Sequence, residues 1–199
     1  MHPNPQFRES DRAFHLGLVD KTGFGMIFAN TPDGPRVAHT PVIAFGADRL
    51  RFHIARGNAL TRHLTSARAL LVVNGPDAYV SARWYSDPDQ VSTWNYTAAE
   101  AEGTVEALDR QGLLDLLEAL TERHEARIAH GEPWSMDKLS DKQREGLLKA
   151  IVGFEMTVDT WRETVKLSQN KSREVRHEVI AGLEREGEVV LSSAMREFD

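Results

Sequence analysis

The sequence contains no cysteine, which excludes disulfide bonds, thiolate metal sites and thiol chemistry from the 199-residue chain. No apolar run approaches the roughly 20 residues that span a bilayer, so we expect no membrane segment. The first residues lack the apolar core of a signal peptide, and we expect a cytoplasmic protein. The net charge of −6 argues against general binding to nucleic acid, which needs a basic surface. DNA binding would require a local basic patch, for which residues 162–176 are the candidate.

Several nucleotide-binding and catalytic motifs are also absent. There is no G-x-G-x-x-G, no P-loop lysine motif and no G-x-S-x-G elbow. His124 and His130 lie six residues apart, which would turn their rings about 240° from each other on a helix, so they do not form a metalloprotease pair. We therefore predict no metal site. A bound nucleotide must be held by strands and side chains rather than by a glycine-rich turn.

The pattern of apolar residues predicts a chain rich in β-strands. Between Leu50 and Ile54, apolar residues alternate with Arg51 and His53, as in a strand with one buried face. Further strand patterns, bounded by turn residues, cover the ranges 24–29, 36–45, 67–74, 78–85, 96–108 and 153–158. The short connections favour antiparallel neighbours, and hence a small antiparallel β-barrel.

Helical patterns surround these strands. Residues 10–21 are predicted to form a short helix, and Ser10 is a suitable N-cap for it. Residues 58–64 form a shorter candidate helix. Residues 111–129 carry an apolar stripe that extends to Ile128. These segments are too few for strands and helices to alternate along the whole chain, which favours a mainly β fold of the α+β class.

Two further helices are predicted from their ends. Ser140 and Gln143 form a capping-box pattern before a short helix whose inward face consists of Leu147, Leu148 and Ile151. A C-terminal helix covers about 172–186, and Gly187 suits its end. We predict one domain over residues 1–199, an antiparallel β-barrel with a helical insertion at about 111–151.

The segment Trp94-Asn95-Tyr96 places two aromatic residues around an amide, in a predicted loop that leads into a strand. A tryptophan in such a place needs a covering surface. One interpretation is that Trp94 closes the end of the barrel or a dimer interface. The other is that the rings contact a flat ligand and Asn95 supplies hydrogen bonds.

Polar side chains near several predicted strand ends are of the types that bind a phosphate. They include Arg51, Arg56 and the segment Lys166-Leu-Ser-Gln-Asn170. Each of them alone also suits an ordinary solvated surface. Their shared chemistry favours an anionic ligand held by strand-borne groups.

Longer strings along the chain resemble the PaiB family, whose members are described as FMN-binding negative transcriptional regulators. The strings are Ala38-His-Thr-Pro41, Phe52-His-Ile-Ala-Arg-Gly-Asn58, Gly75-Pro-Asp-Ala-Tyr-Val-Ser81, Trp84-Tyr85, Val91-Ser-Thr-Trp-Asn-Tyr96, Pro133-Trp-Ser135, Ala150-Ile-Val-Gly-Phe-Glu155 and Lys166-Leu-Ser-Gln-Asn170. The resemblance implies a split β-barrel related to pyridoxamine-phosphate oxidase. It also implies FMN as the cofactor and a homodimer with the flavin at the subunit interface. The family more often has serine where this chain has Ala38.

The resemblance also implies a set of cofactor-binding residues in three groups. One wall would consist of His39, Thr40, Pro41, His53, Ala55, Arg56, Asn58, Tyr79 and Ser81. The residues that close the site would be Trp84, Thr93, Trp94, Asn95 and Tyr96. Lys166, Ser168 and Gln169 would complete it.

Three functions follow from these observations. The first is a flavin-dependent redox protein, in which His39 and His53 are the side chains with a suitable pKa range for proton transfer. The second is a regulator that binds DNA or a protein partner, with or without flavin. The third is a protein that binds haem or another flat ligand, with a histidine as the axial ligand.

Overall fold

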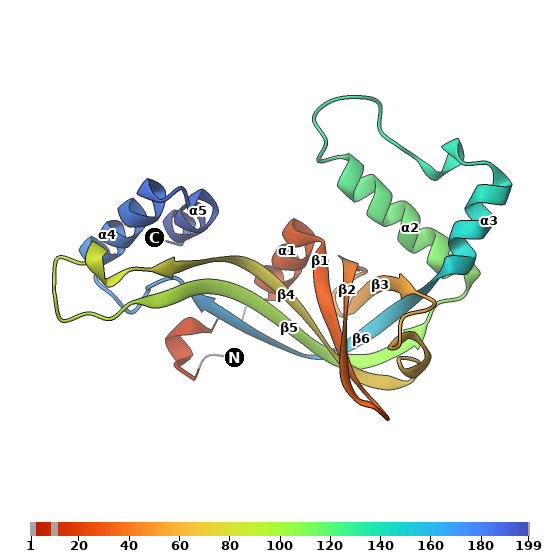
Figure 1. The fold of residues 1–199 in the computed structure, drawn as a ribbon, viewed down its shortest axis with the longest axis horizontal. Helices are drawn as coiled ribbons and strands as arrows, with labels where there is room; N and C mark the ends of the chain where they lie inside the picture. The colour runs from red at the N-terminus through yellow and green to blue at the C-terminus, as the bar shows by residue number, and fades with distance from the viewer. Residues whose placement is uncertain (1–2, 9–11, 199) are drawn as a thin grey trace. The chain divides into compact units, whose positions relative to one another are not determined.

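The computed structural model describes residues 3–8 and 12–198, and Figure 1 shows the order of its elements. The strands of this part are β1 (Phe24–Thr31), β2 (Gly34–Ala44), β3 (Arg49–Ala55), β4 (Ala67–Val80), β5 (Thr93–Ala107) and β6 (Ile151–Lys166). The helices are α1 (Arg12–Thr22), α2 (Arg110–Glu125), α3 (Asp141–Ala150), α4 (Arg173–Arg185) and α5 (Val189–Glu197). Short 3-10 turns occur at Pro5–Phe7, Thr61–His63, Ala82–Trp84 and Met136–Lys138. No described helix is long and apolar enough to cross a membrane.

The strands form a closed barrel in the order β1-β2-β3-β6-β5-β4. The pairs β1–β2, β2–β3, β3–β6 and β1–β4 are antiparallel. Strands β1 and β2 are joined by a tight turn at Gly34, where φ is +99°. The predicted antiparallel α+β barrel is confirmed.

Strand β3 has the alternation that its sequence predicts. Leu50, Phe52 and Ile54 are buried, and the Phe52 ring stacks on Phe154 of β6 with centroids 5.6 Å apart. Arg51 lies on the opposite face, where its Nε donates to Glu155 Oε2 at 2.6 Å. The non-core face of β3 thus carries polar groups beside the barrel core.

The segment from 67 to 85 differs from the prediction of two strands joined by a turn. Residues Ala67–Val80 form the single strand β4, so the described chain has six strands instead of seven. Gly75 does not turn the chain. A Cβ at this position would lie 2.1 Å from Thr97 Oγ1, so the glycine allows a close approach of the backbone to β5.

The predicted helix ends are partly confirmed. Ser140 and Gln143 form the expected capping box at the start of α3. Helix α2 is capped by Asp109, whose Oδ1 accepts from the Gly112 N–H at 2.7 Å, and it ends at Glu125 instead of residue 129. Ile128 therefore lies beyond the helix, and 61% of it is exposed, which contradicts its place in the apolar stripe.

Three other helix predictions concern the inward face of α3, the helix at residues 58–64 and the N-cap Ser10. Of the residues predicted to face inward from α3, Leu148 is buried as expected, Leu147 is exposed, and Ile151 already belongs to β6. Residues 58–64 contain only the 3-10 turn Thr61–His63. Ser10, the predicted cap of the first helix, lies outside the described residues.

The C-terminal segment contains one helix more than predicted. Helix α4 ends near Gly187, which has φ +85° as expected, but the chain resumes as α5 two residues later. The N-cap of α5 is Glu188, which makes no side-chain capping hydrogen bond. The sequence therefore carries no start signal for this helix.

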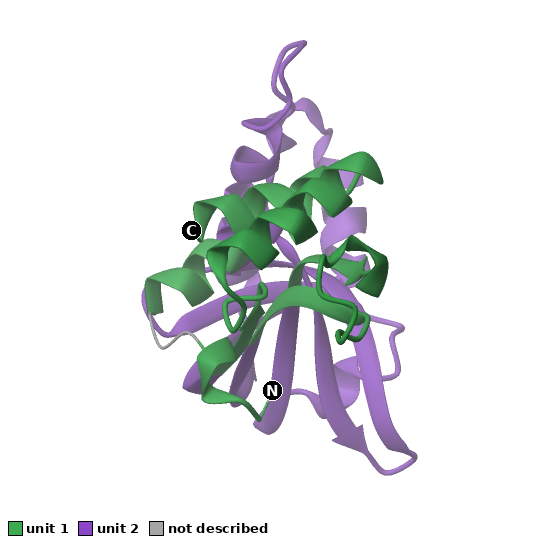
Figure 2. Ribbon diagram, turned by 90° about the vertical axis from the view of Figure 1, so that its left-hand side faces the viewer, with its two compact units in different colours: residues 1–18, 74–99, 162–199 green, residues 19–73, 100–161 purple. Residues whose placement is uncertain are grey.

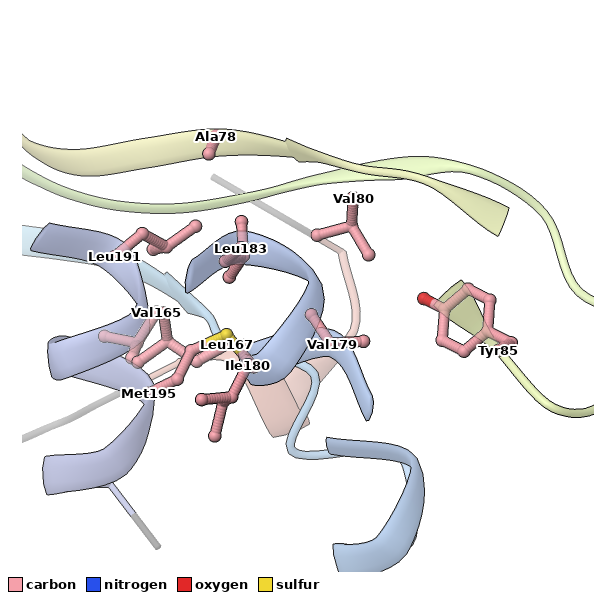
Figure 3. Packing of buried hydrophobic residues seen from close by; sticks show 10 residues of the cluster. All are labelled: Ala78, Val80, Tyr85, Val165, Leu167, Val179, Ile180, Leu183, Leu191 and Met195. Atoms are coloured by element: carbon pink, nitrogen blue, oxygen red, sulfur yellow. The ribbon is translucent and has the colours of Figure 1, made fainter. Parts of the chain in front are cut away.

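The chain divides into two compact units, shown in Figure 2. Unit 1 consists of residues 1–18, 74–99 and 162–199, and unit 2 of residues 19–73 and 100–161. In unit 1, α4 and α5 pack against β4 and β6 through a cluster of buried side chains (Figure 3). In unit 2, Leu116 and Leu120 of α2 pack on Ile43 of β2.

Candidate functional site

The residues that the sequence assigns to the cofactor site fall into both units. Unit 2 contains His39, Thr40, Pro41, His53, Ala55, Arg56 and Asn58. Unit 1 contains Tyr79, Ser81, Trp84, Thr93, Trp94, Asn95, Tyr96, Lys166, Ser168 and Gln169.

In unit 2, Thr40 links β2 to β3. Its hydroxyl is fully buried and donates to the carbonyl oxygen of His53 at 2.5 Å. Because Thr40 has no exposed surface, its role in this structure is to position the backbone at His53. Pro41 follows in β2, and its carbonyl oxygen also lies 3.1 Å from the Thr40 hydroxyl.

The two candidate histidines of unit 2 have different surroundings. The His39 ring is exposed and stacks on the Phe24 ring, with centroids 6.5 Å apart and planes 14° apart. The His53 ring is half-buried, and burial lowers its pKa. Its Nδ1 is buried and has no hydrogen-bond partner among the described residues. At neutral pH, His53 is therefore an uncharged imidazole.

Arg56 directly follows β3 and is fixed by the backbone at the end of α3. Its Nε donates to the carbonyl oxygen of Lys149 at 2.8 Å, and its Nη2 donates to that of Ile151 at 3.1 Å. Its backbone N–H donates to the carbonyl oxygen of Ala150 at 2.8 Å. Asn58 then caps the next turn, because its Oδ1 accepts from the Leu60 N–H at 2.9 Å. The guanidinium is thus held in place without a carboxylate.

A hollow of about 270 Å³ lies beside Arg56 within unit 2. Its cationic side chains are Arg56, Arg110 and Lys149, and Asp109 is its one acid. Apolar residues of β6, α2 and α3 complete the lining, among them Val152, Leu113 and Leu148. Cations on apolar walls are suited to an anionic group attached to an organic ligand.

The three cations of this hollow differ in whether a carboxylate pairs with them. Arg110 forms a bidentate pair with Glu145, which holds the pKa of that carboxyl below its usual value. The charge of Lys149 also lowers the pKa of Glu145, but Lys149 makes no ion pair in the described part of the chain. Arg56 donates only to carbonyl oxygens. Lys149 and Arg56 are therefore the cations most available to a ligand.

In unit 1, Trp94 and Tyr79 form an exposed aromatic pair. Their rings meet edge to face with centroids 6.1 Å apart, and 54% of Trp94 and 49% of Tyr79 are exposed. Strand β5 begins at Thr93, three residues before the predicted start at Tyr96, so Trp94 belongs to a strand and not to the predicted loop. Two large aromatic surfaces next to each other suit a ligand ring or a partner chain.

Asn95, between these aromatic residues, points the other way. It is fully buried, and its Nδ2 donates to Ser168 Oγ at 2.9 Å. Its Oδ1 is buried and has no hydrogen-bond partner among the described residues. Ser168 has φ +60°, which non-glycine residues adopt infrequently. Asn95 therefore joins β5 to the segment after β6, inside unit 1.

Lys166 is a half-buried cation near the end of β6. Its Nζ donates to Thr93 Oγ1, and no carboxylate pairs with it in the described part of the chain. Burial lowers the pKa of this ammonium group. A partly desolvated cation without an acid partner is a frequent feature of binding sites.

The remaining candidates of unit 1 support local structure. The Gln169 side chain accepts from the Leu167 N–H at 2.7 Å and donates to the carbonyl oxygens of Gln6 and Val165. Ser81 accepts from the Arg83 N–H at 3.3 Å and caps the turn that contains Trp84. The Trp84 ring lies against Gly182 of α4, where a Cβ would be only 2.3 Å away.

Sequence reasoning missed three polar residues that the structure places near β3. Lys149 and Arg144 belong to α3, and Arg110 begins α2. Their side chains line hollows that also contain Arg56 or His53. The available signal was the position of Lys149 at the end of a predicted helix, immediately before a predicted strand.

Comparisons with known proteins add the following findings. A family model described as "Putative FMN-binding domain" matches residues 1–160, a range that ends before Lys166. The chain is 33% identical over 173 residues to Protease synthase and sporulation protein PAI 2 of Bacillus subtilis, covering 85% of this chain and 82% of that protein. It is 30% identical over 168 residues to an uncharacterized protein of Emericella nidulans, covering 69% and 67%.

Two solved structures share the fold. The FAD and Heme binding protein from Mycobacterium smegmatis superimposes with a TM-score of 0.61 at 21% identity, covering 88% of this chain and 80% of that chain. The flavocytochrome Anf3 from Azotobacter vinelandii gives 0.62 at 16% identity, covering 89% and 77%. At these identities the likeness establishes the fold.

Proposed function

Because this chain belongs to the PaiB-type family of FMN-binding domains, we propose that it is an FMN-dependent redox protein in which Arg56 and Lys149 hold the FMN phosphate. The family match confirms FMN as the expected cofactor. The observation that carries the phosphate assignment is the hollow of about 270 Å³, where both cations lie on apolar walls.

The donor set of this hollow fits the phosphate end of FMN. A guanidinium fork and an ammonium group are the side chains that bind phosphate oxygens. The contacts of Arg56 with two backbone carbonyl oxygens hold its guanidinium in place before a ligand arrives, which lowers the ordering cost of binding. The apolar side chains of Leu113 and Val152 would contact carbon atoms of the ligand.

FMN supplies electron or hydride transfer when it is bound. The part of the chain is to bind and orient it. Unit 1 has groups of its own that suit contact with a flavin. Lys166 offers a partly desolvated positive charge, and the Tyr79–Trp94 pair offers flat apolar surface. Thr40, Asn95 and Gln169 form hydrogen bonds within the protein, and we assign no general acid or base.

The proposal includes a homodimer whose interface contains Tyr79 and Trp94. Their exposure leaves a large apolar area that a second copy of the chain would cover. We also propose a cytoplasmic location, with which the lack of cysteine agrees.

The alternative role of transcriptional regulator would use the basic segment 162–176. Arg176 of this segment is buried, and its Nη2 donates to the carbonyl oxygen of Met195 at 3.1 Å. This side chain is therefore part of the α4–α5 packing. A DNA contact would depend on the other basic residues of the segment, and we favour the redox role.

Replacing Lys166 with alanine tests separately whether this cation of unit 1 contacts FMN. Loss of a charged hydrogen bond costs about 1.5–3 kcal/mol, so we expect FMN to bind about 10- to 150-fold more weakly. The measurement is titration of FMN and of riboflavin, which lacks the phosphate, followed by flavin fluorescence. If Lys166 binds the phosphate, the affinity for riboflavin stays constant.

Lys171→Ala is the matched control, because Lys171 is another lysine of unit 1 and its Nζ donates to Gln90 at 2.6 Å. We expect this variant to bind FMN as the unmodified protein does. An unchanged FMN affinity of Lys166→Ala would remove Lys166 from the site.

A further inference from the structure

A second cavity in unit 2 lies on the other side of Leu148 and Ile151 from the Arg56 hollow, and it has a different chemistry. Its volume is about 290 Å³, and it is bounded by β3, α2, the segment 134–139 and α3. We infer that this cavity binds a small aromatic carboxylate of one or two rings. The inference does not depend on FMN binding, because the polar residues of this cavity, His53 and Arg144, are not those assigned to the FMN phosphate, and the cavity is assigned a different ligand.

The size of the cavity limits the ligand. A cavity of about 150 Å³ lined by apolar side chains accommodates benzene. The present cavity is about twice as large, so it has room for two fused rings or for one ring with a short substituent. The three-ring system of a flavin with its ribityl phosphate chain would extend beyond this space.

The walls of the cavity favour an aromatic body. Leu117 of α2, Leu148 of α3, Trp134 and Met136 surround it. Tryptophan and methionine both make favourable contacts with aromatic rings. The apolar part of the ligand is therefore assigned to these side chains.

The polar residues on the lining distinguish an acid from a hydrocarbon. They are His53 of β3, Arg144 of α3 and the uncharged Thr121 of α2. Because Nδ1 of His53 is buried without a partner in residues 3–8 and 12–198, Nε2 is the ring nitrogen that remains to contact a ligand. Burying an N–H group without an acceptor costs more free energy than burying an unprotonated nitrogen without a donor. Nδ1 is therefore unprotonated, and the proton of the neutral ring is on Nε2. His53 thus presents a donor.

Arg144 supplies the positive charge. Its Nη2 donates to Asp141 Oδ1 at 2.9 Å, but the Asp141 carboxylate is almost fully exposed, so water screens this pair. Glu145, whose pKa the charge of Arg144 also lowers, is engaged in the bidentate pair with Arg110. The remaining guanidinium nitrogens of Arg144 make no hydrogen bond within the described residues. They are free to bind one carboxylate.

Nearby acidic residues fix the orientation of the ligand. Glu118, Glu122 and Glu125 line an adjacent hollow of about 430 Å³ on the other side of Trp134 and Met136. Their negative charge disfavours a carboxylate at that end. The carboxylate is therefore directed toward His53 and Arg144, and a ligand with a second carboxylate is disfavoured.

The test uses isothermal titration of the full-length protein with three probes. They are 2-naphthoate, the uncharged 2-naphthamide of the same shape, and anthracene-2-carboxylate with a third ring. We expect 2-naphthoate to bind one molecule per chain, about tenfold more tightly than the amide. We expect the three-ring acid to bind no more tightly than 2-naphthoate, because the cavity does not cover its third ring.

Two variants of α3 distinguish an effect of the Arg144 charge in the cavity from an effect of the net charge of the helix. Arg144→Gln is expected to reduce the affinity for 2-naphthoate to that for the amide. Lys142→Gln removes the same charge from an exposed position outside the cavity lining and should keep the tenfold preference. Failure of 2-naphthoate to bind, equal affinity for the acid and the amide, or an unchanged preference in Arg144→Gln would each overturn the inference.

Discussion

Reversing the charge of Arg56 is expected to weaken FMN binding by about 100-fold or more and to leave riboflavin binding nearly unchanged. Removing one charged hydrogen bond costs about 10- to 150-fold in affinity, and a glutamate adds repulsion of the phosphate. Riboflavin has the same ring system without the phosphate, so it reports damage to the rest of the site. Fluorescence titration of both flavins measures the effect.

Two further variants of unit 2 make this result specific. Arg56→Gln retains a donor for the carbonyl oxygens at the end of α3 but removes the charge, and we expect about a tenfold loss of FMN affinity. Arg36→Glu makes the same change of charge on the exposed surface of β2 and should have little effect. Equal losses for FMN and riboflavin in Arg56→Glu would indicate a structural role for Arg56 and contradict its phosphate role.

Replacing Leu183 with alanine is expected to lower the free energy of unfolding by about 3–5 kcal/mol. Leu183 is fully buried in the cluster between α4, α5 and the strands, where Val80, Leu191 and Met195 surround it (Figure 3). Its removal leaves a cavity that the packed helices fill incompletely. Urea unfolding followed by circular dichroism measures this loss.

Val190→Ala is the control for Leu183→Ala, because Val190 belongs to α5 but 66% of it is exposed. A surface change of this kind alters the free energy of unfolding by about 0.5 kcal/mol or less. If Leu183→Ala were equally mild, the cluster of Figure 3 would not be a tightly packed core.

The features that could be predicted from the sequence depend on neighbouring residues. The alternation around Phe52 follows from the period of a strand, and the start of α3 follows from Ser140 and Gln143, three residues apart. The sequence around Gly75 predicts a turn, because glycine and proline usually mark turns. The real function of Gly75 depends on Thr97, which is distant in the sequence, so no local pattern could reveal it.

The candidate site shows the same limit. Motifs identified Arg56, His53 and Lys166, but they could not show that Asn95 is buried and bonded to Ser168. Arg144 and Lys149 were missed because their importance depends on α3 lying next to the end of β3. Sequence patterns indicate which residue types are present, whereas packing decides which of them remain available to a ligand.

The central claim is that this chain binds FMN. Its most direct test is the visible absorption spectrum of the purified protein after incubation with FMN and gel filtration. Flavin absorbs near 450 nm, roughly, and we predict that this band elutes with the protein at about one FMN per chain. A folded protein that elutes without the band, while all of the flavin appears in the small-molecule fraction, would contradict the claim.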